Sequence, residues 1–135
     1  MDGFKSAIAD NSNLEIVASQ TADWTREKGQ SVTESILTAN PDVTILYAPY
    51  DEMALGGLTV VKERNLLDQI SVVGYGCTKD GVAAIEADEM AATIDVGEYG
   101  TGFDIVNAVT DFCINGKRCR KRLSIVHLRF MIRLI

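Results

Sequence analysis

Hydrophobic and polar positions along the chain change between two periods, one typical of buried strands and one typical of amphipathic helices. Short apolar, β-branched runs predict strands at residues 14–18, 43–47, 70–75 and 91–96. Apolar residues at helical spacing predict helices at residues 3–10, 24–39, 52–64, 82–87 and 103–116. For the second helix, Thr21 or Asp23 is the expected N-cap, and Asn65 suits the left-handed residue that ends the third.

Helices and strands that alternate in this way indicate the α/β class, with a doubly wound, mostly parallel sheet. Parallel neighbours need a crossover connection, and a helix usually supplies it. The sequence opens on a helix, so the first strand that would normally precede it is missing from the pattern. We therefore expect unpaired sheet edges and possible self-association through them, unless a partner or the tail supplies a strand.

Composition is that of one soluble globular domain, because the 135 residues are 47% hydrophobic and 24% charged. No apolar run approaches the length of a membrane span, and residues 1–10 lack the basic and apolar regions of a signal peptide. All 19 acidic residues lie at or before Asp111, whereas seven of the 13 basic residues lie from Lys117 onward. An acidic body of this kind argues against nucleic acid as a partner.

The charge change divides the chain into a body, residues 1–116, and a divergent basic and apolar tail, residues 117–135. The tail begins with KRCRKR, which is either a solvated face or a patch for nucleic acid or membrane, and the solvated face is the commoner case. Residues 123–135 are apolar and β-branched, so they are expected to pair as an edge strand or to promote aggregation.

Candidate catalytic and metal-binding groups are sparse. Cys77, Cys113 and Cys119 form no C-x-x-C pair, and His127 is the single histidine, so no zinc site and no Ser-His-Asp arrangement is predicted. Residues 74–76 read GYG without the third glycine of a dinucleotide fingerprint. We expect no enzymatic activity, no cofactor and no metal.

The most informative corner of the chain follows the strand at residues 43–47. Pro49 ends that strand, and Asp51 is placed to cap the next helix. Tyr50 and Asp51 then lie at the carboxyl end of a strand, where open α/β sheets bind ligands. For Asp51, capping explains the residue more fully than ligand contact does.

Six separated motifs carry a resemblance to a known family. They are DGF at 2–4, ASQTADWTREKG at 18–29, ANPDV at 39–43, YDEMALGG at 50–57, VVGYG at 72–76 and AATI at 91–94. In order and spacing they resemble periplasmic sugar-binding proteins of the ribose-binding type, the type I solute-binding proteins of ABC importers. The resemblance covers about residues 1–116 and corresponds to a partial C-terminal ligand-binding lobe with a flavodoxin-like fold.

The resemblance implies a clamp in which two lobes close on one small molecule, a sugar or sugar derivative, and then dock on an ABC permease. The N-terminal lobe is missing from this sequence, and the intact parent is expected to be periplasmic or extracellular. An aromatic residue at the position of Trp24 packs on the sugar ring in that family, and an indole face suits this contact. The alternative is that Trp24 is a partly buried residue at the start of a helix.

Several family positions are occupied by less polar residues here. Tyr50 stands for a usual asparagine, Gly76 for an aspartate, Val96 for a glutamine and Met1 for an arginine. A site lined by Trp24, Tyr50, Tyr75 and Val96 leaves sugar hydroxyls unpaired, at about 1–3 kcal/mol each. Tight ribose binding is therefore not expected; a different ligand, a sugar derivative or a decayed site fits better. Tyr75 suits a pocket wall or the core equally.

Two other functional classes remain open. One is the effector-binding domain of a LacI-type transcription regulator, which shares the fold, although the aspartate pair frequent in regulators is absent at Gly76 and Cys77. The other is an interaction module without a ligand. TADWTREKG and DEMALGG favour the importer class.

Overall fold

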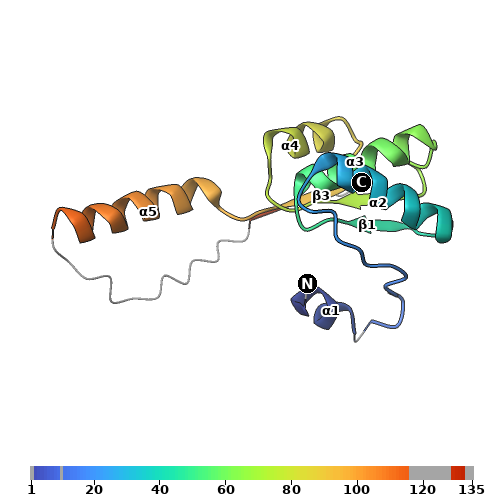
Figure 1. Cartoon of the computed structure of the whole chain (residues 1–135), viewed down its shortest axis with the longest axis horizontal. Coiled ribbons are helices and arrows are strands. Elements are labelled where there is room, and N and C mark those ends of the chain that lie inside the picture. The colour runs from blue at the N-terminus through green and yellow to red at the C-terminus, as the bar shows by residue number, and fades with distance from the viewer. Residues whose placement is uncertain (1, 10, 116–128, 133–135) are drawn as a thin grey trace.

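The computed structural model of the chain describes residues 2–9, 11–115 and 129–132. The helices are α1 (Asp2–Ala9), α2 (Arg26–Ala39), α3 (Asp51–Glu63), α4 (Lys79–Glu86) and α5 (Glu98–Cys113), and the strands are β1 (Ile45–Tyr47), β2 (Ser71–Val73), β3 (Ala92–Asp95) and β4 (Arg129–Ile132). Their order alternates as predicted (Figure 1).

One sheet joins the four described strands in the order β1-β2-β3-β4. β1 pairs with β2 and β2 with β3 in parallel, whereas β4 lies antiparallel to β3. Helix α3 lies against β1 and β2, and α4 lies against β3. Helix α1 lies on the side of β1 away from α2 and α3 (Figure 1), where Phe4 stacks on Tyr47 with ring centroids 4.5 Å apart. The doubly wound, mostly parallel fold is confirmed.

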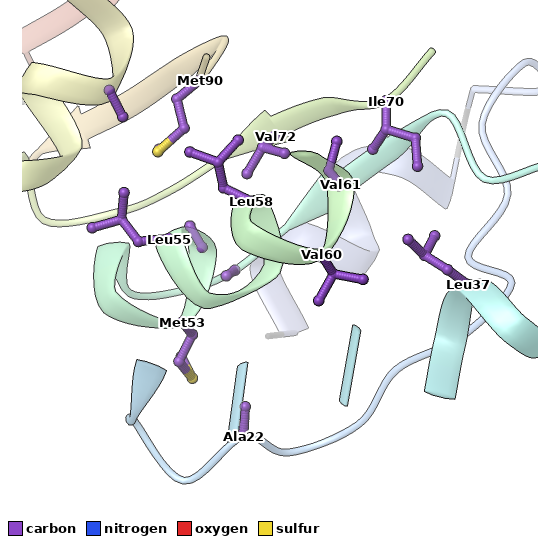
Figure 2. Close-up of a cluster of buried hydrophobic side chains, with 13 residues drawn as sticks. Ala22, Leu37, Met53, Leu55, Leu58, Val60, Val61, Ile70, Val72 and Met90 are labelled. Atoms are coloured by element: carbon purple, nitrogen blue, oxygen red, sulfur yellow. The ribbon is translucent and has the colours of Figure 1, made fainter. Parts of the chain in front are cut away.

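The core surrounds α3 and includes side chains of the sheet, such as Val72, and of α2, such as Leu37 (Figure 2). Its largest fully buried apolar side chains are Val60, Val61 and Val72. Helices α2 and α3 pack backbone against backbone, because each presents a glycine to the other. A Cβ on Gly29 would lie 2.5 Å from the carbonyl oxygen of Met53, and one on Gly56 would overlap the carbonyl oxygen of Arg26. The next residue, Gly57, faces Leu46 of β1, so this glycine allows α3 to pack closely on the sheet.

The strand predicted at residues 14–18 is wrong. The segment is irregular, and Leu14, Ile16 and Val17 are all largely exposed. A strand needs a neighbour for its backbone hydrogen bonds, and no described strand lies beside this segment. The apolar pattern alone was therefore not sufficient to predict a strand here.

The predicted start of the second helix is also wrong. Helix α2 begins at Arg26, and its N-cap is Thr25, whose hydroxyl accepts a hydrogen bond from the Lys28 N–H at 3.2 Å. Asp23 and Trp24 have φ values of 47° and 63°, outside the helical region. The left-handed residue expected at Asn65 is confirmed by its φ of 56°.

Both ends of the described sheet agree with expectations drawn from the sequence, since residues of the tail pair as an edge strand and one edge stays open. Part of the predicted apolar tail forms β4 and pairs with β3, with Ile94 opposite Phe130. β1 remains the outer strand on the other side. Residues 116–128 and 133–135, including the basic run, lie outside the described residues, so the predicted domain boundary stays a prediction.

Helix α5 extends away from the sheet (Figure 1). Its apolar residues are mostly on the surface, with exposed fractions of 58% for Phe103 and 64% for Val106. None of the described helices has the length and apolar character that crossing a bilayer requires.

Candidate functional site

The loops that follow β1 and β2 meet at the carboxyl edge of the sheet. The strands are parallel, so both loops emerge on the same side, and backbone bonds tie them together. The Ala48 N–H donates to the Val73 carbonyl at 2.9 Å, and the Asp51 N–H donates to the Tyr75 carbonyl at 2.9 Å. Tyr50 and Tyr75, predicted from different motifs, are therefore held on adjacent loops.

Asp51 is a buried connecting residue and not the cap that the sequence predicted. Helix α3 has Tyr50 as its N-cap, without a side-chain cap bond, and Asp51 is the first helical residue. The Asp51 side chain is completely buried. Its Oδ2 accepts a hydrogen bond from the Thr78 N–H at 2.7 Å, and its Oδ1 accepts one from the Thr93 hydroxyl at 2.6 Å. Both carboxylate oxygens are thus engaged inside the protein.

The Asp51 carboxylate fixes the loop at residues 74–78. Thr93 Oγ1, which donates to Asp51, also accepts a hydrogen bond from the Cys77 N–H at 3.1 Å. Two glycines leave the room that the carboxylate occupies, because a Cβ on either Gly74 or Gly81 would overlap it. The loop turns sharply here, with φ values of 126° at Gly76 and 54° at Cys77. Its shape therefore depends on one buried acidic side chain.

Trp24 and Tyr50 form an aromatic pair at this edge. Their ring centroids are 6.0 Å apart with the planes inclined at 56°. The Trp24 side chain is 66% exposed, and Tyr50 is half-buried, its ring packed over Gly76. Trp24 precedes α2 and does not start it, unlike the alternative drawn from the sequence, and about a third of the residue is covered. An exposed indole backed by a second ring is suited to stacking on a flat ligand.

Tyr75 follows β2 at this same edge of the sheet. It is 38% exposed, and it interacts electrostatically with Tyr47. Burial, followed by the nearby Tyr75 hydroxyl, raises the pKa of Tyr47 above its ordinary value of 10.0. Tyr75 is thus partly exposed, and its role as a pocket wall or a core residue stays a prediction. Val96 is half-buried just after β3.

Sequence reasoning missed Arg26, which joins the N-termini of the three helices α2, α3 and α4. Its Nε and Nη2 donate to the Glu52 carboxylate at 2.9 and 3.2 Å, and Nη2 also donates to Asp80 at 2.9 Å. Hydrogen bonds to Glu52 and then to Asp80 raise the pKa of Arg26. Arg26, Glu52 and Asp80 are far apart in sequence, so no local motif predicts the contact between their side chains.

A cavity of about 570 Å³ lies beside this site, on the outer side of β1. It is bounded by α1, residues 14–24, α2 and β1, and most of its lining is apolar. Of the four predicted site residues, Trp24 alone is in contact with it. Within the described ranges, no group of three or more His, Cys, Asp or Glu side chains is arranged to hold a metal ion.

Comparison with known proteins gives one family. Residues 1–118 match a family model described as periplasmic binding protein domain. The ribose import binding protein RbsB of Haemophilus influenzae is 46% identical over 93 residues, covering 69% of this chain and 31% of that protein. RbsB of Bacillus subtilis is 33% identical over 117 residues, covering 87% of this chain and 37% of that protein.

A solved structure confirms the fold. It is an ABC transporter periplasmic solute binding protein from Actinobacillus succinogenes with bound D-allose, with a TM-score of 0.84 and 28% identity. The match covers 97% of this chain and 44% of that one. The chain thus spans about a third of the length of the sequence relatives and less than half of this structural relative.

Proposed function

Because the chain belongs to the periplasmic binding protein family, we propose that it forms part of a lobe that binds a sugar or sugar derivative at the carboxyl edge of its sheet. The relatives above are binding proteins, two of them for ribose import and one with D-allose bound. These relatives support the importer class over the LacI-type alternative. The activity proposed is binding without catalysis.

The observation that carries the proposal is the exposed Trp24 ring beside Tyr50. The C–H face of a sugar ring is apolar, and it packs on an aromatic face while the hydroxyls remain at the edge. Trp24 supplies the stacking surface, Tyr50 adds a phenol hydroxyl within reach of the same ligand, and Tyr75 forms a wall of the site.

In this proposal Asp51 positions the site and does not touch the ligand. Its oxygens are occupied by Thr78 and Thr93, and its side chain is inaccessible to solvent. The remaining polar groups near Trp24 are few, so a ligand with many hydroxyls would lose hydrogen bonds to water without replacing them. A methylated or deoxygenated sugar therefore suits the site better than ribose does.

The whole parent is proposed to be a two-lobed, periplasmic or extracellular clamp that delivers its ligand to an ABC permease. The relatives' additional length is consistent with a second lobe. A ligand held by one lobe lacks half of its contacts, so binding to this chain alone is expected to be millimolar, about −4 kcal/mol or weaker.

Trp24 is the only tryptophan, so its indole N–H gives one assignable NMR signal that reports on the site. We expect saturable shifts of this signal with methyl β-D-ribofuranoside, and weaker ones with D-ribose and D-allose. Ligand-observed saturation transfer should disappear in Trp24→Ala and persist in Trp24→Phe. Phe103→Ala, which removes an exposed ring on α5, is the matched control and should bind normally.

The proposal is wrong if no sugar shifts the indole signal up to about 100 mM, or if Trp24→Ala binds as well as the parent chain. Submicromolar ribose binding by this chain would contradict the weaker claim that one lobe is insufficient.

A further inference from the structure

The turn that carries Trp24 has an unusual backbone. The Thr25 N–H donates to the Ala22 carbonyl at 3.1 Å, so residues 22–25 form a β-turn. Its central residues, Asp23 and Trp24, have positive φ values of 47° and 63°, the pattern of a type I′ turn. Glycine, asparagine and aspartate suit these positions, whereas a tryptophan is strained there. The turn is therefore expected to need contacts outside itself to keep this conformation.

The indole contributes little to holding its own turn. Trp24 is 66% exposed, and its ring contact is the one with Tyr50, 6.0 Å away between centroids. Ala22 is buried and anchors the first end of the turn. The close glycine contacts between α2 and α3 begin at Arg26, so the turn lies just before them. The second end of the turn is thus held only as firmly as Arg26 itself.

The Arg26 side chain connects this end of the turn to two other loops of the site. Its Nε and Nη2 donate to Glu52, in the first turn of α3, at 2.9 and 3.2 Å. Nη2 also donates at 2.9 Å to Asp80, in the first turn of α4. Tyr50 directly precedes α3, and the loop at residues 74–78 directly precedes α4. One guanidinium therefore ties together the starts of three helices, each of which follows a loop of the site.

We propose that Arg26 is a positioning residue, which holds the Trp24 ring beside Tyr50 through its bridge to Glu52 and Asp80. The purpose of this role rests on the proposed function, because an ordered indole benefits a ligand that stacks on it. The ring geometry itself is measurable without any ligand. Arginine suits the role, since its planar fork fixes the direction of a carboxylate as well as its distance.

An exposed ion bridge is strong enough for this role. Arg26 is 44% exposed, so its contacts add little to global stability. Ordering one turn requires only a local preference. A fivefold change in the ratio of ordered to displaced turn corresponds to about 1 kcal/mol, which lies within the range measured for exposed pairs.

The test compares the purified chain with Arg26→Gln by NMR, first without ligand. The two readouts are the nuclear Overhauser effects between the Trp24 and Tyr50 rings and the order parameter of the single indole N–H. In Arg26→Gln we expect the ring effects to fall about twofold and the order parameter to fall from about 0.8 to about 0.6 or lower. A merely structural role would lower the unfolding midpoint and leave both readouts of the folded protein unchanged.

Three further measurements separate positioning from other effects of the substitution. Arg26→Lys keeps the charge without the fork and should restore the ring contact in part. About 1 M salt should move the parent chain toward the values of Arg26→Gln and leave Arg26→Gln unchanged. Lys28→Gln, which removes a charge from the exposed side of the same helix, is the matched control and should match the parent in both readouts.

Glu52→Gln tests the bridge from its other end and does not require Arg26→Gln to fold. It should loosen the rings in the parent chain and have no further effect in the Arg26→Gln background, because both substitutions break one interaction. With methyl β-D-ribofuranoside, Arg26→Gln should weaken binding about twofold, since fewer molecules have the ordered turn.

The proposal is overturned if folded Arg26→Gln keeps the ring contact and the indole order of the parent, or if Glu52→Gln loosens the rings equally in both backgrounds. If Arg26→Gln loosens the rings but the parent chain binds no sugar, the positioning role stands and the proposed function fails. If the parent binds the sugar and Arg26→Gln binds it equally with unchanged rings, the proposed function stands and the positioning role fails.

Discussion

Asp51 and Thr93, 42 residues apart in the sequence, are joined inside the protein by a hydrogen bond of 2.6 Å from the Thr93 hydroxyl to Asp51 Oδ1. Both side chains are buried, at 0% and 2% exposure. This contact connects the start of α3 to β3, and Thr93 in turn accepts from the Cys77 N–H. The position of the loop at residues 74–78 therefore depends on a polar contact in the interior.

Removing the Asp51 carboxylate should destabilise the fold substantially. Asp51→Ala leaves the Thr78 N–H and the Thr93 hydroxyl buried without acceptors, at a cost of about 3 kcal/mol in the free energy of unfolding. Thr93→Val should cost about 1–2 kcal/mol. Urea unfolding of both single variants and the double variant gives the coupling energy. Effects that add within about 0.5 kcal/mol would contradict a direct interaction.

Gly81→Ala tests the space around the same carboxylate. The added methyl group would lie 2.5 Å from Asp51 Oδ2, so the loop or the helix must shift, at about 1–3 kcal/mol. Gly100→Ala in α5 is the matched control, because a Cβ there meets nothing within 4 Å. That variant should be neutral or more stable, since alanine favours a helix by up to about 1 kcal/mol. Equal thermal unfolding midpoints for the two variants would contradict the close contact between Gly81 and the Asp51 carboxylate.

Arg26 should contribute little to stability despite its three hydrogen bonds. It is 44% exposed, and solvent screens its contacts with Glu52 and Asp80. Arg26→Gln should lower the free energy of unfolding by about 1 kcal/mol or less, and the loss should shrink at about 1 M salt. Lys28→Gln removes the same charge from the same helix at an exposed position and is the control. A loss from Arg26→Gln that does not change with salt would show a contribution other than charge pairing.

Tyr47 should make stability fall at alkaline pH. Its pKa is raised in the folded state, so its contribution is complete below the ordinary value of 10.0 and is lost as pH rises through the folded value. Absorbance at 295 nm should show a tyrosine ionisation that is complete only well above pH 10.0. Tyr47→Phe should abolish that late step and flatten the stability decline above pH 10, and an unchanged titration curve would contradict the assignment.

The sequence predicted β1, β2 and β3 well because each is a short apolar run between breaking residues. Residues 14–18 have the same pattern and still form no strand, because strand formation also requires a neighbour. Pattern alone cannot supply that neighbour, since pairing depends on residues distant in the chain.

Only part of the candidate site could be predicted from the sequence, because contacts between residues distant in the chain also shape it. The exposed pair of Trp24 and Tyr50 follows from motifs in two loops that parallel strands bring together. Asp51 was placed correctly in the chain but assigned the wrong role, because a capping aspartate and a buried connecting aspartate occupy nearly the same position before a helix. Arg26 was missed because Glu52 and Asp80 lie 26 and 54 residues away.

The glycine contacts between α2 and α3 have a consequence for the aromatic pair. Trp24 precedes one of these helices and Tyr50 precedes the other, and Gly56 lies directly against the backbone at Arg26. The close packing of α2 on α3 thus fixes the backbone from which the two rings extend. A ligand that stacks on Trp24, as proposed above, would meet a backbone already in place, so little protein entropy would be lost on binding.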